Sequence, residues 1–178
     1  KRNLFILDKS YQNQYDDFYK KFIQKKFCLF HFDEKWNKLK LSDYNNTLKI
    51  INNLSKKIKI IVTTGNKDFY FLKDLIEKFN SINFNINDFN SMNYKNKNSI
   101  FLVENLPINL LAHFIINSKK NFSFHGGPII HISSAYDIPV VDLIPKYKND
   151  ELDRWIPTIS KYTRINFEDL SDDVINKI

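Results

Sequence analysis

The sequence has little cysteine, little glycine and no long apolar run. Cys28 is the one cysteine among 178 residues, which excludes a disulfide framework and a cysteine-based metal site. A lone thiol suits a reducing compartment. No stretch approaches the ~20 consecutive apolar residues of a membrane span, and no signal-peptide pattern is visible. The first residue is lysine rather than methionine, so we expect an excised domain or a processed product.

The composition is that of a folded domain with a basic balance. Apolar residues make up 43% and charged residues 26% of a chain long enough for one domain with its own core. The net charge of +7 allows a nucleic-acid or an anionic-membrane partner. However, the lysines are spread among asparagines and no nucleic-acid-binding motif is present. We therefore expect no nucleic-acid partner and keep a basic nucleic-acid-binding domain as the least favoured alternative.

Apolar periodicity predicts strands and helices in alternation. Strands are predicted at residues 27–32, 58–63, 82–86, 100–103, 121–124, 140–144 and 162–165. Helices are predicted at residues 11–26, 44–54, 67–79, 108–118 and 128–135, and within 167–178. A polar loop is predicted at 145–153. This alternation predicts the α/β class, with a doubly wound parallel sheet and helices on both faces, in three layers.

The predicted helix at 11–26 carries aromatic residues three and four positions apart, including Tyr15, Phe18 and Phe22, with lysines elsewhere around it. Such a helix can lie on a membrane surface. We favour the alternative, in which the aromatic face packs on its own domain. The expected division is an N-terminal segment and helix at 1–26 and one domain at 27–178.

Residues 121–144 indicate a strand, a glycine loop, a short helix and a buried strand. The loop holds Gly126 and Gly127, two of the three glycines, and Pro128 suits the first helical position. A glycine loop that leads into a helix presents backbone N–H groups and the positive end of the helix dipole, which favours a phosphate. His131 can add a side-chain donor. The local pattern fits equally well a tight connection in which the glycines serve packing.

Two other strand ends carry polar residues. His31, Asp33 and Lys35 end or follow the first predicted strand, where open α/β sheets bind ligands. Lys35 could meet a phosphate as a point charge; the alternative is a solvated turn with Trp36 packed on it. Asp68 begins the helix predicted at 67–79, where it either caps the helix or reaches a ribose hydroxyl.

Four runs in chain order resemble the C-terminal, donor-binding domain of GT-B glycosyltransferases of the family 9, heptosyltransferase-like group. They are Asp-Glu-Lys-Trp at 33–36, Thr-Thr-Gly-Asn-Lys-Asp at 63–68, Val-Glu-Asn-Leu-Pro at 103–107, and His-Gly-Gly-Pro-Ile-Ile-His-Ile-Ser-Ser-Ala at 125–135 with Pro139 beyond it. The likeness spans roughly residues 27–157.

The resemblance implies a Rossmann-like domain that binds a nucleoside-diphosphate-sugar as substrate, without metal or other cofactor. The sugar would pass to a saccharide or lipid-linked acceptor, as in lipopolysaccharide biosynthesis. The expected location is the cytoplasm, with peripheral contact at the inner face of the membrane as a further expectation. The implied diphosphate contacts are Lys35, Gly126, Gly127, Ile129 and His131; the implied nucleoside contacts are Asp68, Glu104 and Leu106; further lining would come from His31, Asp33 and Trp155.

The sequence also departs from the family pattern. The position that usually holds an aspartate is Gly126, or His125 if one residue is inserted. His125 is therefore the candidate catalytic residue. The N-terminal domain that holds the acceptor in such enzymes has no counterpart here, so we expect this chain to be inactive alone. The alternative function is a non-catalytic nucleotide- or partner-binding α/β module.

Overall fold

The computed structural model describes residues 7–32, 41–64, 82–85, 100–104, 106–124, 127–153, 156–157 and 161–178. Seven described strands form one sheet: β1 (Phe27–Phe32), β2 (Lys59–Thr64), β3 (Ile82–Asn85), β4 (Ile100–Glu104), β5 (Lys120–Ser123), β6 (Val140–Ile144) and β7 (Tyr162–Asn166). The longer helices are α1 (Gln12–Phe18), α2 (Leu41–Ser55), α4 (Ile108–Asn117), α5 (Pro128–Ala135) and α7 (Asp172–Lys177).

The strand order is β3-β4-β2-β1-β5-β6-β7, and every neighbouring pair is parallel. From β1 the chain moves outward through β2, and it later crosses back to place β5 on the other side of β1. This is a doubly wound, Rossmann-like sheet, so the predicted fold is confirmed. The bounds predicted for the helix at 128–135 and the strand at 140–144 are those observed.

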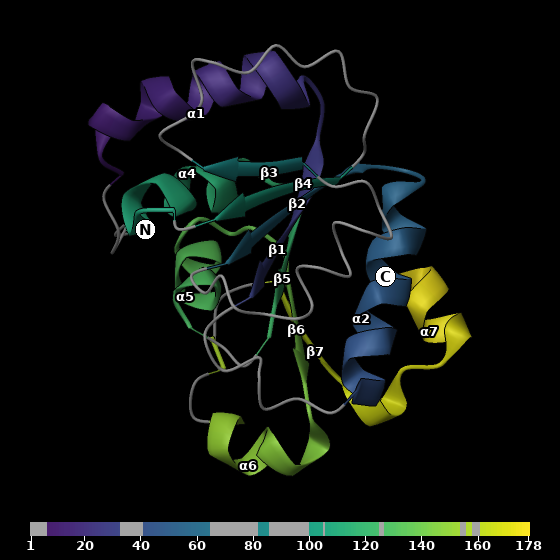
Figure 1. Ribbon diagram of the computed structural model, residues 1–178. Coiled ribbons are helices and arrows are strands. Elements are labelled where there is room, and N and C mark those ends of the chain that lie inside the picture. Colours follow the sequence, from purple (N-terminus) through teal and green to yellow (C-terminus); the bar gives the residue numbers. More distant parts are fainter. Residues whose placement is uncertain are drawn as a thin grey trace.

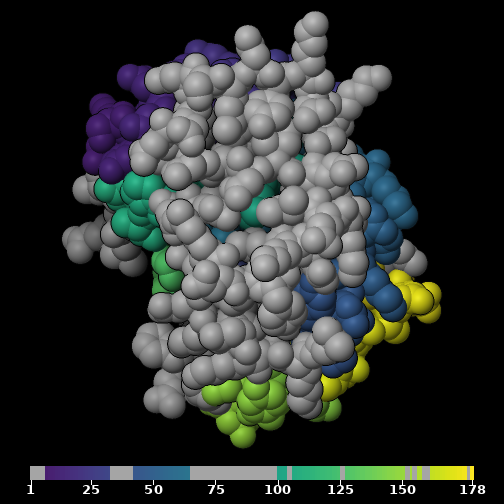
Figure 2. Space-filling view, in the orientation of Figure 1, coloured from purple at the N-terminus to yellow at the C-terminus, as the bar shows by residue number. Residues whose placement is uncertain are grey.

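Helices cover both faces of the sheet (Figure 1). On one face α2 and α7 pack against Phe30, Phe122 and other buried side chains of the sheet. On the other face α1, α4 and α5 pack against a second buried cluster. In the space-filling view α1 lies at the upper left, whereas α2 and α7 lie together at the right (Figure 2). Because both faces are covered, β1 is apolar at nearly every position rather than alternating.

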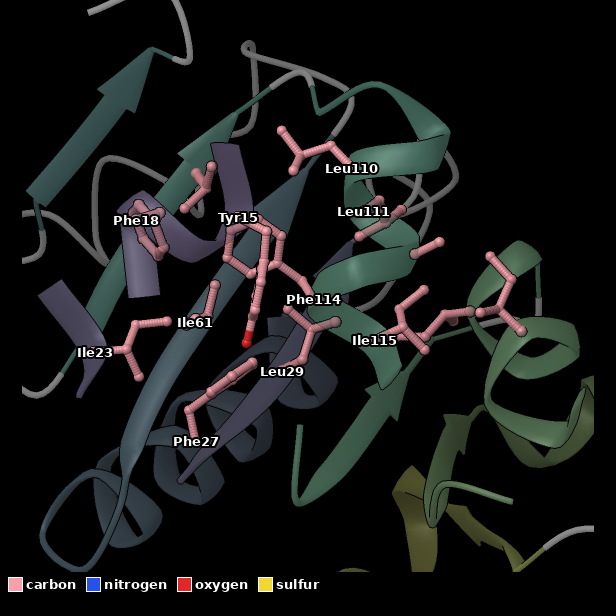
Figure 3. Close-up of a cluster of buried hydrophobic side chains, with 14 of the residues drawn as sticks. Tyr15, Phe18, Ile23, Phe27, Leu29, Ile61, Leu110, Leu111, Phe114 and Ile115 are labelled. Atoms are coloured by element: carbon pink, nitrogen blue, oxygen red, sulfur yellow. The ribbon is translucent and has the colours of Figure 1, made fainter. Parts of the chain in front are cut away.

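The N-terminal helix belongs to the second cluster. Tyr15 and Phe18 are buried, and each ring packs edge-on against Phe114 of α4 with centroids 5.2 Å apart. Figure 3 shows these rings between the helices and the strands β1 and β2. The aromatic face therefore packs on its own domain, as favoured from the sequence. The domain boundary at residue 26 stays a prediction.

Several other bounds differ from the sequence-based prediction by one residue, and α2 begins three residues earlier than predicted, at Leu41. Two further differences have a clear local cause. The helix predicted to run to residue 26 ends at Ile23, after a π-helical turn η2 (Tyr19–Ile23), because Gln24 is left-handed with φ 53° and its N–H bonds the Tyr19 carbonyl. The polar loop predicted at 145–153 instead holds a 3₁₀ turn, η5 (Lys146–Lys148), and the single-turn helix α6 (Asn149–Leu152). One turn is too short to show a helical period in the sequence.

A buried amide connects three elements near the start of β5. Asn121 Nδ2 donates to the Ile115 carbonyl of α4 at 3.1 Å and to Ser133 Oγ of α5 at 2.9 Å. Ser118 Oγ donates to Asn121 Oδ1 at 2.7 Å. The Asn121 side chain is fully buried, so these bonds replace the water that it loses on folding. The amide thus fixes α5 to the end of α4 and to the sheet.

Candidate functional site

The sheet changes winding direction at β1 and β5, its two central strands. In open α/β sheets the carboxyl ends of the strands at such a point flank the ligand crevice. Here those ends are His31 and Phe32 of β1 and Ser123 of β5. On the α2 side of the sheet Phe32 stacks on Phe124, with centroids 4.6 Å apart. The parallel pairing of β1 and β5 therefore brings these two strand ends to one edge of the sheet.

Helix α5 begins immediately beyond β5. Gly127 caps it with φ 86° and ψ −170°, a conformation open essentially to glycine alone, and Pro128 is the first helical residue. Both features agree with the sequence-based reading of this loop. Gly127 and Pro128 are exposed. The first turn of a helix has N–H groups without intrahelical partners, so this end can receive an anion.

The two predicted contacts inside α5 differ in exposure. The Ile129 side chain is fully buried in the cluster under α4 and α5, so Ile129 can offer a ligand only its backbone N–H. His131 is exposed, and its imidazole lies one turn along the helix. Burial of Ile129 anchors the helix, while Gly127 and Pro128 at its start stay at the surface.

His31 lies at the carboxyl end of β1 and is held by β2. Its Nδ1 is 2.9 Å from Oγ1 of Thr63, which lies opposite in the strand register. The Thr63 hydroxyl has one proton, and the Phe30 carbonyl is 3.5 Å away, so either Nδ1 or the hydroxyl can be the donor in the shorter contact. Burial lowers the pKa of His31 to about 4, so the ring is neutral at neutral pH. A neutral imidazole can accept a hydrogen bond here without adding charge.

Two of the three predicted nucleoside contacts lie at the end of β4 and just before α4. Leu106 is half-buried and packs against the second cluster. Glu104 is the last residue of β4, and its backbone pairs with Thr64 of β2. Both positions stand at the same sheet edge as the carboxyl end of β5, which precedes α5. The remaining predicted site residues lie outside the described residues: Asp33, Lys35, Asp68, His125, Gly126 and Trp155.

One polar network was missed from the sequence. Tyr162 of β7 donates to the buried carboxylate of Asp142 at 2.9 Å, and Arg164 Nε donates to Tyr162 Oη at 3.1 Å. Arg164 also pairs with Asp153, which follows α6. Burial and Asp142 raise the pKa of Tyr162, which keeps the phenol protonated as a donor. These contacts hold β7 and the end of α6 to the sheet.

The described residues offer few other reactive groups. Cys28 is buried, and burial raises the pKa of its thiol to about 11, so it is not a nucleophile at neutral pH. Within the described ranges, no cluster of three or more His, Cys, Asp or Glu side chains could hold a metal ion. In the same ranges, no helix is both long enough and apolar enough to cross a membrane.

Comparison with known proteins yields a likeness in fold. No protein-family model matches the chain, and no curated protein matches it. A glycosyl transferase family 9 structure from Veillonella parvula DSM 2008 is similar over 97% of this chain, with a TM-score of 0.59 at 10% identity. A structure of S. aureus MnaA with UDP is similar over 96% of this chain, with a TM-score of 0.52 at 13% identity.

The chain spans 45% of the family 9 structure and 38% of the MnaA structure, so both neighbours are much longer. At these identities the likeness concerns the fold. It supports the Rossmann-like α/β architecture that the strand order displays.

Proposed function

We propose that this chain is the nucleotide-sugar donor-binding half of a glycosyltransferase that delivers a sugar to a cell-surface glycan or glycolipid. The observation that carries the proposal is the start of α5 at the switch point of the sheet, where Gly127 leads into an exposed helix end. The fold neighbours add support, since one is a glycosyl transferase and another contains UDP.

In the proposed reaction an acceptor hydroxyl oxygen bonds to the anomeric carbon and its proton passes to a general base. At the same time the bond between the anomeric carbon and the diphosphate oxygen breaks, and negative charge develops on the leaving nucleoside diphosphate. The positive end of α5 and a donor from His131 would stabilise that charge. Lys35 would approach from the loop after β1. The nucleoside would lie toward Asp68, Glu104 and Leu106.

The first test is nucleotide binding by His131→Ala. A hydrogen bond to a charged group contributes about 1.5–3 kcal/mol, so we expect nucleoside diphosphates to bind about one to two orders of magnitude more weakly. Calorimetry with the four common nucleoside diphosphates measures this directly. Melting without nucleotide shows whether the variant keeps the wild-type stability.

Lys35→Ala and the pair Lys20→Ala with Lys21→Ala serve as comparisons. Lys35→Ala should lower nucleotide affinity and its salt dependence, because Lys35 belongs to the proposed site. The pair is exposed on η2 and should change neither. Equal affinities for wild type and His131→Ala, or equal losses in both lysine variants, would contradict the site. Binding of single-stranded oligonucleotides in preference to nucleotides would favour the nucleic-acid alternative.

The second test concerns transfer. Since the chain spans 45% of the family 9 structure, we propose that the acceptor surface belongs to the part not represented here. The 178-residue chain should then show a nucleotide-dependent rise in melting temperature and no transfer to a saccharide or lipid-linked acceptor. Sugar transfer by this chain alone would contradict the proposal. It would mean that His125 or a neighbour acts as the catalytic base without any further part of the enzyme.

A further inference from the structure

Lysines gather at the sheet edge opposite the candidate nucleotide site. They line an open hollow of about 470 Å³ at the amino ends of three adjacent strands, β1, β2 and β5. The lysines that line it are Lys25, Lys26, Lys56, Lys57, Lys59 and Lys119. Ser55 and Ile58 also line the hollow. Because the strands are parallel, their amino ends lie at one edge, on the side where α2 ends in Figure 1.

Part of this charge has a structural explanation. The lysines follow the carboxyl ends of three helical segments, η2, α2 and α4, and cations there stabilise the helix dipole. Each helix end carries about −0.5 elementary charge, roughly −1.5 for three ends. The positive charge of the six ammonium groups exceeds the negative charge of the three helix ends several-fold. Helix capping therefore accounts for a minor part of the positive charge.

No carboxylate compensates the excess within the described residues. None of the ion pairs between them involves these lysines, and no acidic side chain lines the hollow. Lys59 is held in place, because its Nζ donates to the Phe22 carbonyl at 2.6 Å and lies over the Phe101 ring. Burial and the neighbouring Lys25 charge lower the pKa of Lys59, which agrees with a positive local potential.

The lining also limits the type of ligand. Among the described residues that line the hollow, none has an aromatic side chain on which nucleic-acid bases could stack. The exposed large apolar residues Ile108, Tyr147 and Ile156 lie on other segments, so the described rim offers no large apolar side chain for insertion into a bilayer. A concave surface of flexible ammonium groups fits a compact group with several negative charges.

We infer that this hollow is a second anion site, which binds a compact polyphosphorylated group, either of a soluble metabolite or of a lipid head group. It is independent of the proposed nucleotide site, because the two lie at opposite ends of the central strands.

Calorimetry with inorganic tripolyphosphate tests the inference on the full chain. Wild type should bind tripolyphosphate more tightly than orthophosphate, and affinity should fall as salt rises. The double variant Lys56→Ser with Lys57→Ser should bind roughly tenfold more weakly, from two exposed charge contacts. It leaves Lys59, which supports the fold, unchanged. The matched control is Lys20→Ser with Lys21→Ser, which removes the same charge elsewhere and should bind like wild type.

Two further arms locate and identify the ligand. His131→Ala should bind tripolyphosphate like wild type. If His131→Ala loses tripolyphosphate binding while the Lys56 and Lys57 variant keeps it, the anion binds at α5 and the inference is overturned. Equal losses in both lysine pairs, or no binding by wild type, would also overturn it. Vesicles of phosphatidylcholine with a bisphosphorylated inositol lipid distinguish the two sources. Binding that tripolyphosphate displaces indicates a head group, and absence of vesicle binding indicates a soluble ligand. Vesicle binding that tripolyphosphate fails to displace contradicts a compact site.

Discussion

Phe122→Ala is expected to lower the free energy of unfolding by about 3–5 kcal/mol. Phe122 lies in the centre of β5 and is fully buried. Its ring stacks on Phe30 of β1 with centroids 4.1 Å apart and planes within 3°. The substitution removes buried apolar surface, leaves a cavity between the sheet and α2, and deletes an aromatic pair. Urea unfolding followed by circular dichroism measures the change.

Tyr147→Ala is the matched control, because it also deletes an aromatic ring but one that is 63% exposed. It should change the free energy of unfolding by less than about 0.5 kcal/mol. Phe122→Leu should lie between the two, since it keeps part of the volume. A cost below about 1 kcal/mol for Phe122→Ala would show that the core at β1 and β5 is loosely packed.

Acidification is expected to destabilise the protein through His31. The pKa of His31 falls from 6.5 to about 4 on folding because the ring is buried. Between about pH 4 and 6.5 the His31 imidazole therefore binds a proton more tightly in the unfolded chain than in the folded protein. The free energy of unfolding rises with pH across this window. The contribution of His31 to the free energy of unfolding is complete above about pH 6.5 and is lost as the pH falls toward 4. The loss amounts to at most roughly 3 kcal/mol.

The difference between wild type and His31→Gln isolates this effect. Glutamine can still hydrogen-bond Thr63 Oγ1 but does not titrate, and the carboxylates shared by both proteins contribute equally. Denaturant unfolding from pH 7.5 to 4.5 should show the steeper loss of stability in wild type. Parallel pH profiles would mean that His31 is protonated as easily in the folded protein as in the unfolded chain.

Much of the fold follows from local signals. Pro128 and Pro139 bracket a short apolar helix, which is why the predicted bounds of α5 and β6 agree with the structure. Apolar runs without alternation indicate strands covered on both faces. The end of the N-terminal helix was misplaced because glutamine rarely signals a left-handed cap, and Gln24 adopts one.

The site was less predictable because its contacts join distant residues. His31 and Thr63 meet across 32 positions, through a strand register that no local pattern specifies. The position of Asn121 likewise gives no sign that it would bond both α4 and α5. The glycine at 127 is the exception, since a helix entry with positive φ demands that residue type. The roles assigned by resemblance to Lys35, Asp68, His125 and Trp155 stay predictions.

The buried amide of Asn121 has a consequence for the entropy of binding. Its bonds to the Ile115 carbonyl and to Ser133 hold α5 in place before any ligand arrives. On the proposed function, an anion at the start of α5 would meet amide groups whose directions are already set, and little chain freedom would be lost on binding. The Asn121 amide would then raise the affinity for the anion without touching it.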